Sequence, residues 1–343
     1  MASLLCSLPL DCTLSSSATR VGNLKGWAPM LRTRVRTLVV LVSMFMPNVA
    51  IAQTLPTSQL VPNEVIAQTP TTSQLISTVA VAQTLPTSQP NMITIVREEV
   101  KLGRDADHAK VEAGWPAAYE KAKSPDYYLA MTSMTGAPEA WYVTAYASHA
   151  AIGDSLKRED GDAVLTAELT RLRRADADMI TSVRVMQARA RTDLSYGAYP
   201  DLAKQRFFEF TWFRVRPGHE AQFEAAGKAY GAATKRSAAN SAYRVYEVVA
   251  GVPGPTYLII SSVGSYSDFD QSMTDGDKIM KGVNIEEGLA LQKFMLEGVV
   301  NVETQRFRVD PVQSYVPKET RAQDPEFWMP KKPLPSKPTT QQQ

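Results

Sequence analysis

Cysteine is nearly absent from this 343-residue chain, and both cysteines, Cys6 and Cys12, lie before residue 30. The rest of the sequence therefore has no residue that could form a disulfide, a thiolate metal site or a cysteine nucleophile. Histidine is also scarce, with only His108, His149 and His219 in the whole sequence. Any imidazole chemistry would have to involve one of these three residues.

Familiar catalytic signatures are missing as well. The sequence contains no HExxH, Walker, GxGxxG or GxSxG motif. This excludes zinc hydrolases, nucleotide enzymes and serine hydrolases of the well-known kinds. Metal-ligating residues form no cluster along the sequence, so no metal site is predicted.

Charge of one sign is not in excess. The chain has 37 basic and 35 acidic residues, and hydrophobic residues make up 44% of it, as in ordinary globular proteins. A balanced and scattered charge gives no electrostatic reason to expect a nucleic-acid partner. The longest apolar run is well short of the roughly 20 residues that a spanning helix needs. We therefore expect no stable membrane span in the mature chain.

Residues 30–52 have the three parts of a secretory signal peptide. Arg32, Arg34 and Arg36 form a basic region, residues 38–46 are apolar, and small residues precede Gln53. The pattern predicts cleavage near Ala52/Gln53 and export to the periplasm or the exterior. It also suggests a true start at Met30, with residues 1–29 an artefact of start-site choice.

Two polar segments flank the predicted folded region. Residues 53–91 repeat with a period of 15, from IAQTLPTSQ through IAQTPTTSQ to VAQTLPTSQ. This segment is too polar to build a core and predicts a disordered linker, in which the mature terminus is ambiguous because the cleavage-site residues recur. Residues 316–343 form a proline-rich tail, expected to be extended, in which Phe327 and Trp328 are able to pack back on the domain.

The region between these segments contains the same order of predicted strands and helices twice. Each half predicts strand, helix, two strands, helix and strand, the split βαβ order. In 92–196 the expected elements are a strand at 92–102, a helix at 105–123, strands at 127–134 and 139–147, a helix from 148 broken near 160–162, and a strand at 182–191. In 206–315 they are a strand at 206–216, a helix at 217–237, strands at 242–249 and 256–263, a helix at 268–294 broken near Gly282, and a strand at 299–309.

Matching motifs close the two halves. RARTD at 189–193 leads to Ser195-Tyr196, and RFRVD at 306–310 leads to Ser314-Tyr315. The fold class predicted is thus α+β, with two tandem ferredoxin-like units. A four-stranded sheet covered by helices on one face leaves its other face apolar, so we expect the two sheets to cover each other as an intramolecular α/β barrel. The helix alignment stays open between two choices: His108 matches His219, or Val111 matches Phe223.

With WYVTAYAS at 141–148 and FRVRPGHEAQF at 213–223, residues 92–315 resemble the dimeric α/β-barrel superfamily. That group includes antibiotic-biosynthesis monooxygenases, NIPSNAP proteins and haem-degrading relatives. The resemblance implies a cofactor-independent monooxygenase or a haem-handling enzyme. No motif assigns an axial role to a residue here, so no cofactor is predicted, haem remains an alternative, and His149 is only a weak catalytic candidate.

Eight other residues are candidates for ligand binding. Alternation places Trp141 and Val143 on one strand face and Tyr142 and Tyr146 on the other, so one set faces the space between the sheets and the other packs under helices. Paired arginines suit a carboxylate or phosphate, although exposed arginine–aspartate pairs are the more ordinary outcome. The candidates are Trp141, Tyr142, Tyr146, His108, Trp212, His219, Arg189 and Arg306.

Three functions fit these observations. The first is an exported monomer or homodimer that binds a small molecule between two sheets, and the absence of converging polar groups favours it. The second is the enzyme that the resemblance implies. The third is a structural or interaction protein. Fold alone does not decide among them.

Overall fold

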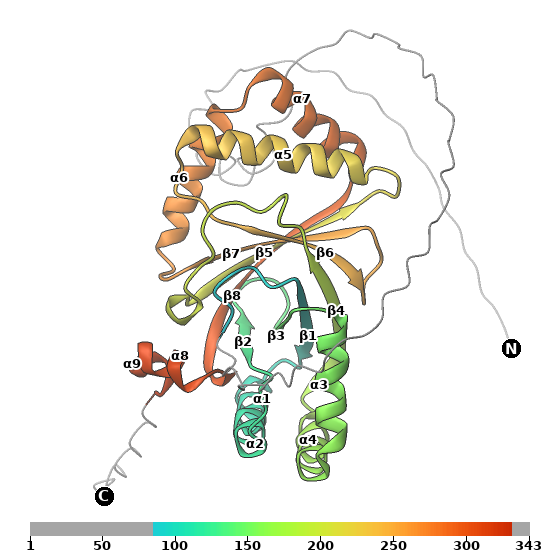
Figure 1. Cartoon of the computed structure of the whole chain (residues 1–343), viewed down its shortest axis with the longest axis vertical. Coiled ribbons are helices and arrows are strands. Elements are labelled where there is room, and N and C mark those ends of the chain that lie inside the picture. Colours follow the sequence, from blue (N-terminus) through green and yellow to red (C-terminus); the bar gives the residue numbers. More distant parts are fainter. Residues whose placement is uncertain (1–84, 331–343) are drawn as a thin grey trace, which may run out of the picture. The chain divides into compact units, whose positions relative to one another are not determined.

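The computed structural model describes residues 85–330 (Figure 1). The predicted start-site extension 1–29, the signal peptide 30–52 and most of the repeat segment 53–91 lie outside the described residues. Residues 331–343 of the tail also lie outside them.

Eight antiparallel strands form one closed barrel in the order β1-β3-β2-β8-β5-β7-β6-β4. The first half contains β1 (Met92–Val100), α1 (Asp105–Glu112), α2 (Gly114–Ala122), β2 (Tyr128–Ser133), β3 (Glu139–Tyr146), α3 (His149–Gly161), α4 (Ala163–Asp176) and β4 (Ile180–Ala190). The second half contains β5 (Phe207–Val215), α5 (Glu220–Ser237), β6 (Arg244–Ala250), β7 (Thr256–Val263), α6 (Asp268–Lys281), α7 (Ile285–Lys293), the π-helical turn η2 (Phe294–Gly298) and β8 (Val299–Tyr315).

This architecture confirms the prediction of two tandem ferredoxin-like units in one intramolecular barrel. Each half forms a four-stranded sheet, and two seams join the sheets, where β2 pairs with β8 and β4 pairs with β6. At the second seam Gly251 has a φ of +98°, and a Cβ there would lie 2.2 Å from the Val185 carbonyl oxygen. Only glycine tolerates both conditions, so Gly251 lets the turn after β6 approach β4 closely.

The helices follow the local signals of the sequence. The break predicted near 160–162 is present because Asp162 caps α4, accepting hydrogen bonds from the Val164 and Leu165 N–H groups. The break predicted near Gly282 is also present, between α6 and α7. The single helix predicted over 105–123 is instead two helices, α1 and α2, that meet at Ala113. The strand predicted at 299–309 extends to Tyr315, because residues 310–315 continue toward β2.

Two layers of apolar side chains lie on the two faces of the barrel wall. The inward residues of all eight strands form the main core, centred on Trp141, Phe210 and Phe307. The outward residues pack under helices: α5, α6 and α7 cover the second sheet, and α1 to α4 lie on the side of the first (Figure 1). The sheets therefore hide each other from water, as predicted.

Part of the proline-rich tail folds back on the barrel, although the sequence predicts an extended tail. Residues after β8 form α8 (Lys318–Gln323) and α9 (Pro325–Trp328). Trp328 is buried, and its Nε1 donates a hydrogen bond to the Ala203 carbonyl, 3.0 Å away, in the short 3₁₀ helix η1 (Leu202–Lys204). The large apolar area of this indole explains why the tail docks.

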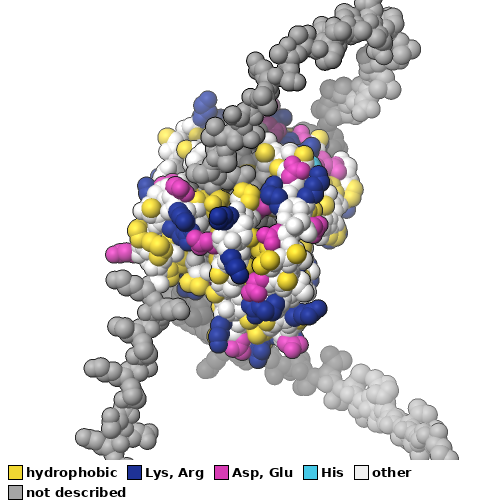
Figure 2. Space-filling view, turned by 60° about the horizontal axis from the view of Figure 1, so that its bottom comes forward, with side chains coloured by type: hydrophobic (Ala, Val, Ile, Leu, Met, Phe, Trp, Pro, Cys, Tyr) yellow, Lys and Arg dark blue, Asp and Glu magenta, His cyan; other side chains and the backbone are white. Residues whose placement is uncertain are grey.

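Basic and acidic side chains are intermixed on the face shown in Figure 2. None of the helices in residues 85–330 combines the length and the apolarity that a bilayer crossing requires.

Candidate functional site: a cavity in one end of the barrel

A cavity of about 310 Å³ lies in one end of the barrel interior. Inward side chains of six strands form its walls, among them Ile93, Leu129, Val143, Phe208, Tyr246 and Ile260. They face inward because alternate residues of each strand share one side of the sheet. The volume is at the lower end of the range for small-molecule sites, and the lining is predominantly apolar, as in most such sites.

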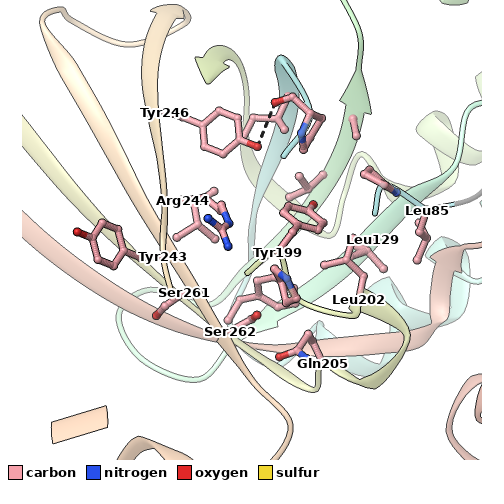
Figure 3. A pocket seen from close by; sticks show the side chains of 18 of the residues that line it. Leu85, Leu129, Tyr199, Leu202, Gln205, Tyr243, Arg244, Tyr246, Ser261 and Ser262 are labelled. Carbon is pink, nitrogen blue, oxygen red and sulfur yellow. Dashed lines mark hydrogen bonds between the residues drawn. The ribbon is translucent and has the colours of Figure 1, made fainter. Parts of the chain in front are cut away.

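Two segments outside the strands complete the cavity (Figure 3). The first precedes β1 and contributes Leu85, Pro86 and Pro90. It is held by Gln89, whose Nε2 donates to the Val245 carbonyl at 3.0 Å, and by the Tyr246 hydroxyl, which donates to the Pro90 carbonyl at 3.3 Å. The sequence predicts a disordered linker over 53–91, whereas its last residues, 85–91, lie against the barrel.

The second segment connects the two halves and contributes Tyr199, Leu202 and Gln205. No function was predicted for these residues, because residues 197–205 fall between the two repeated units. The docked tail supports them, since Trp328 binds the Ala203 carbonyl. The walls of the cavity therefore come from the repeated fold, and its rim comes from segments that are not repeated.

Arg244 is the charged residue of the cavity lining. Its guanidinium donates to the carbonyls of Tyr196 at 3.0 Å, Gly197 at 2.8 Å and Ala198, and it lies 5.6 Å from the Tyr199 ring. Its Nε is buried without a hydrogen-bond partner, and within residues 85–330 it forms no ion pair. Burial lowers the pKa of Arg244 from its ordinary value, because the charge is not compensated. An anionic group would supply the missing compensation.

The two tyrosines beside Arg244 are protonated donors at neutral pH. Burial raises the pKa of Tyr199 to about 12 and that of Tyr246 further still. Figure 3 shows Arg244 and Tyr199 side by side at the cavity, with Tyr246 above them. The arrangement offers hydrogen-bond donors and one positive charge in an otherwise apolar space.

An ion pair closes the opposite end of the barrel. Arg97 donates to both oxygens of Glu139 at 2.7 and 2.9 Å, and its guanidinium lies over Trp141 at 4.7 Å and Trp212 at 5.3 Å. The Trp141 Nε1 also donates to Glu139, at 2.6 Å. Between this ion pair and the cavity, Trp141 packs on Phe210 at 4.8 Å. The interior is therefore filled at one end and hollow at the other.

The aromatic candidates from the sequence divide between the two faces of the barrel wall. Trp141 and Trp212 lie inside the barrel and contact Arg97, outside the cavity lining. Tyr142 and Tyr146 face the helices, where their hydroxyls bond to Gln313 at 3.2 Å and Ser155 at 3.3 Å. The predicted alternation is present, with Trp141 on the inward face.

The arginine candidates lie on the outer surface of the barrel. Arg189 pairs with Glu247 at 2.7 Å, and Arg306 pairs with Glu209 at 2.7 Å while lying 4.0 Å from the Phe269 ring. Each guanidinium already has a carboxylate partner within the chain. The structure brings neither of them to the cavity.

The three histidines occupy three unrelated places. His149 is exposed at the first position of α3. His219 precedes α5, and its Nδ1 lies 2.9 Å from Gln222 Oε1. His108 is buried on the fourth residue of α1, the position that Phe223 has in α5. Of the two alignments left open by the sequence, the structure supports neither, because His108 matches Phe223.

His108 lies under α1 in a cluster of acidic residues. Its Nε2 is 3.1 Å from Glu98 Oε2 and 3.8 Å from Asp176 Oδ1, and Glu112 lies on the same helix one turn later. Burial and the neighbouring carboxylates raise the pKa of Glu112 to about 8, and burial raises that of Asp176 to about 6. Burial alone would lower the pKa of His108, but Glu98, Asp176 and Glu112 raise it above its ordinary value. The burial of several ionisable groups at one point is the main electrostatic feature here.

Sequence reasoning missed the residues that characterise the cavity, chiefly Tyr199, Arg244 and Tyr246. A signal existed for two of them, because Arg244, Tyr246 and Val248 alternate on the inward face of β6. Tyr199 had no such signal, since it lies in a connection without periodicity.

The residues present do not fit a haem group in this cavity. In the described part of the chain no histidine lines it. Burial raises the pKa of Tyr199, Tyr243 and Tyr246 in the lining, which opposes the deprotonation that ligation needs. Met131 also lines the cavity, but cytochromes that use a methionine sulfur as a haem ligand use a histidine as the second ligand. The described lining contains no histidine.

No family model and no curated protein matches this sequence. Among solved structures, a candidate monooxygenase from Fusobacterium nucleatum is similar at 9% identity, with a TM-score of 0.43, over 65% of this chain and 93% of that one. An anthrone oxidase-like protein is similar at 14% identity and a TM-score of 0.41, over 65% and 92%. A mutant chlorite dismutase from Candidatus Nitrospira defluvii shows 6% identity and a TM-score of 0.40, over 66% and 94%.

Likenesses at these identities and scores assign no activity, ligand or cofactor to this chain. The order and pairing of its own strands define the fold: one polypeptide supplies two ferredoxin-like halves that close into a single α/β barrel.

Proposed function

We propose that the barrel cavity binds a small, mainly apolar molecule that carries an anionic group, such as a carboxylate, directed at Arg244. The observation that carries this proposal is a half-buried guanidinium that forms no ion pair within residues 85–330, at the wall of an apolar cavity of about 310 Å³. A buried charge is costly until a partner compensates it, and a guanidinium suits a carboxylate in geometry as well as in charge. The apolar walls would supply most of the affinity, and Arg244 would set the orientation.

Two dyes of similar shape test this proposal. Anilinonaphthalene sulfonate carries an acidic group, and N-phenylnaphthylamine is its neutral counterpart. We expect fluorescence titration to show saturable binding of both dyes to the wild-type protein. Replacing Arg244 with Met should weaken binding of the sulfonate about tenfold or more, which corresponds to the free energy of one charge-assisted hydrogen bond. The affinity for the neutral dye should change by less than about threefold.

A cavity-filling variant separates this site from the general apolar surface. Ala145 lines the cavity, so Ala145→Phe should abolish binding of both dyes. The matched control is Ala225→Phe, which adds the same side chain at an exposed position of α5 and should change nothing. Saturable binding that survives in Ala145→Phe, or no binding by the wild type, would overturn the proposal.

The monooxygenase alternative and the export of the chain stay predictions. Uptake of O₂ by the purified protein on addition of a bound aromatic compound, without added cofactor, would favour the enzyme.

Export rests on residues 30–52 alone. Sequencing the N-terminus of the protein recovered outside the cytoplasm would test it, with Gln53 or an equivalent repeat position expected first.

A further inference from the structure

A second site, separate from the cavity, lies between the outer face of the first sheet and its helices. Glu98 of β1, His108 and Glu112 of α1 and Asp176 of α4 each direct one ligand atom to a common point, and these atoms all lie within 4.8 Å of one another. His108, Glu112 and Asp176 are 2%, 3% and 3% exposed. Three separate elements therefore converge on a small polar volume inside an otherwise apolar layer.

Acidic groups outnumber basic groups at this point. Within residues 85–330, the salt bridges of Glu98 and Asp176 go to His108 alone, and Glu112 has none. Three carboxyl groups thus surround a single imidazole. Buried carboxylates are normally paired or coordinate a metal ion, because the desolvation of an unpaired charge is costly.

One ligand atom accepts no hydrogen bond from the residues that the structure describes. Asp176 Oδ1 is buried and accepts no hydrogen bond, although it lies 3.8 Å from His108 Nε2. Buried carboxylate oxygens are almost always hydrogen-bonded, so one that accepts no hydrogen bond and faces other ligand atoms is a candidate metal ligand.

The equivalent positions in the second half of the chain are occupied by apolar side chains. Glu98 is the seventh residue of β1 and Phe213 the seventh of β5, as His108 and Phe223 are each fourth in α1 and α5. Phe294 of η2 follows α7 shortly before β8, much as Asp176 at the end of α4 comes shortly before β4. The three phenylalanines pack on one another with centroids 5.4 to 6.0 Å apart. The fold is therefore stable with an apolar filling, and the polar cluster is not a requirement of the architecture.

We propose that Glu98, His108, Glu112 and Asp176 bind one divalent transition-metal ion, such as Zn²⁺ or Mn²⁺. Ligand atoms about 2.1 Å from such an ion lie roughly 3.0 to 4.2 Å apart. The 3.1 and 3.8 Å separations around His108 Nε2 fall in this range, and the widest separations in the cluster, up to 4.8 Å, would shorten on binding. Imidazole and carboxylate together suit these ions. The Trp115 Nε1 donates to Glu112 Oε1 at 2.8 Å, which orients this carboxyl group toward the other three ligands.

The site is buried and surrounded by four protein ligands, which is the arrangement of structural metal sites. A bound ion would tie α1 and α4 to β1, the role that aromatic packing has in the second half. The sequence predicts no metal, because Glu98 and Asp176 are far apart along the chain. Only His108 and Glu112, four residues apart on one helix face, gave a local signal.

The test uses the whole protein, stripped of metal with a chelator and then titrated with ZnCl₂ and MnCl₂ by calorimetry. We expect one equivalent of at least one of these ions to bind per chain and to raise the Tm. Asp176→Asn should weaken binding tenfold or more and remove the Tm increase. It should also raise the Tm of the metal-free protein, because one repelling charge is gone. Glu112→Gln gives the same readouts if Asp176→Asn does not fold.

Asp275→Asn is the matched control. Asp275 is equally buried, at 2% exposed, but already has Lys278 as a partner at 2.9 Å. This variant should bind metal like the wild type. If the wild type binds neither ion, or if Asp176→Asn and Glu112→Gln bind as tightly as the wild type, the site is a proton-sharing network and the proposal fails. Because these residues lie outside the cavity lining, failure here leaves the ligand proposal untouched.

Discussion

Arg97 carries a positive charge into the interior of the barrel, where apolar side chains surround it. Its side chain is 14% exposed and that of Glu139 is 9% exposed. The fold tolerates this charge because Glu139 accepts both hydrogen bonds and because Trp141 and Trp212 present ring faces to the guanidinium. The sequence marks both tryptophans as candidate ligand contacts, whereas in the structure they serve this internal ion pair.

Removing one member of this pair should cost more than removing both. Glu139→Gln leaves the arginine buried without a counter-charge, and we expect urea unfolding to show a loss of about 3 kcal/mol. The double variant Arg97→Met with Glu139→Gln should recover most of that loss, since no unpaired charge remains. A single-variant loss below about 1 kcal/mol would mean that water reaches Arg97 and screens it.

At the scale of elements, helix ends show how local sequence and tertiary contact combine. Asn284 and Glu287 form a capping box at the start of α7, with bonds of 2.9 and 3.0 Å to each other's backbone N–H groups. Glu287 also pairs with Arg236 of α5, which ties the two helices together. The cap follows from the sequence N-x-x-E, but the ion pair depends on the packing of α5 against α7.

Asn284→Ala should lower the free energy of unfolding at pH 7 by about 1 kcal/mol, measured by urea unfolding, because the Glu287 N–H loses its side-chain acceptor.

The pKa of Glu287 is lowered, first by Arg236 and then by the Asn284 N–H. A lowered carboxylate pKa stabilises the fold above the ordinary carboxyl range, and this contribution is lost as the pH falls through the lowered pKa. Glu287→Gln should therefore be less stable than the wild type at pH 7, with the difference vanishing at acidic pH. A difference that does not vary with pH would contradict this assignment.

The whole molecule depends on the closure of two half-barrels. The inner face of the second sheet consists of large apolar residues such as Phe208, Phe210, Leu258 and Phe307, and the first sheet packs against it. Each half alone also has two unpaired strand edges, which the seams β2–β8 and β4–β6 occupy in the intact chain.

Residues 206–330 expressed alone should therefore not persist as a folded monomer. We expect light scattering after size exclusion to show a dimer, formed by face-to-face pairing of two copies, or larger aggregates, because the exposed apolar face favours association. The chain of residues 85–330 is the control. A monomeric fragment with cooperative unfolding would show that the halves are independent domains.

Much of the fold could be predicted from the sequence, because strand alternation, helix caps and the repeated order of elements are local or periodic signals. The candidate sites were harder to predict from the sequence. Of the candidate binding residues, none lines the cavity that the structure describes, and Tyr199 lies in a connection that has no periodicity. His108 is in a polar cluster only because α1 and α4 pack on β1.

The sequence by itself determined which segments become strands and helices and that the chain repeats one unit, since these properties depend on residues close to one another along the chain. The tertiary structure decided which strand faces turn inward, that residues 85–91 and the connection at 199–205 complete a cavity, and that Glu98, His108, Glu112 and Asp176 share one point. These contacts join residues far apart in the chain, so strand register and helix packing fix them, and neither is encoded in any short stretch of sequence.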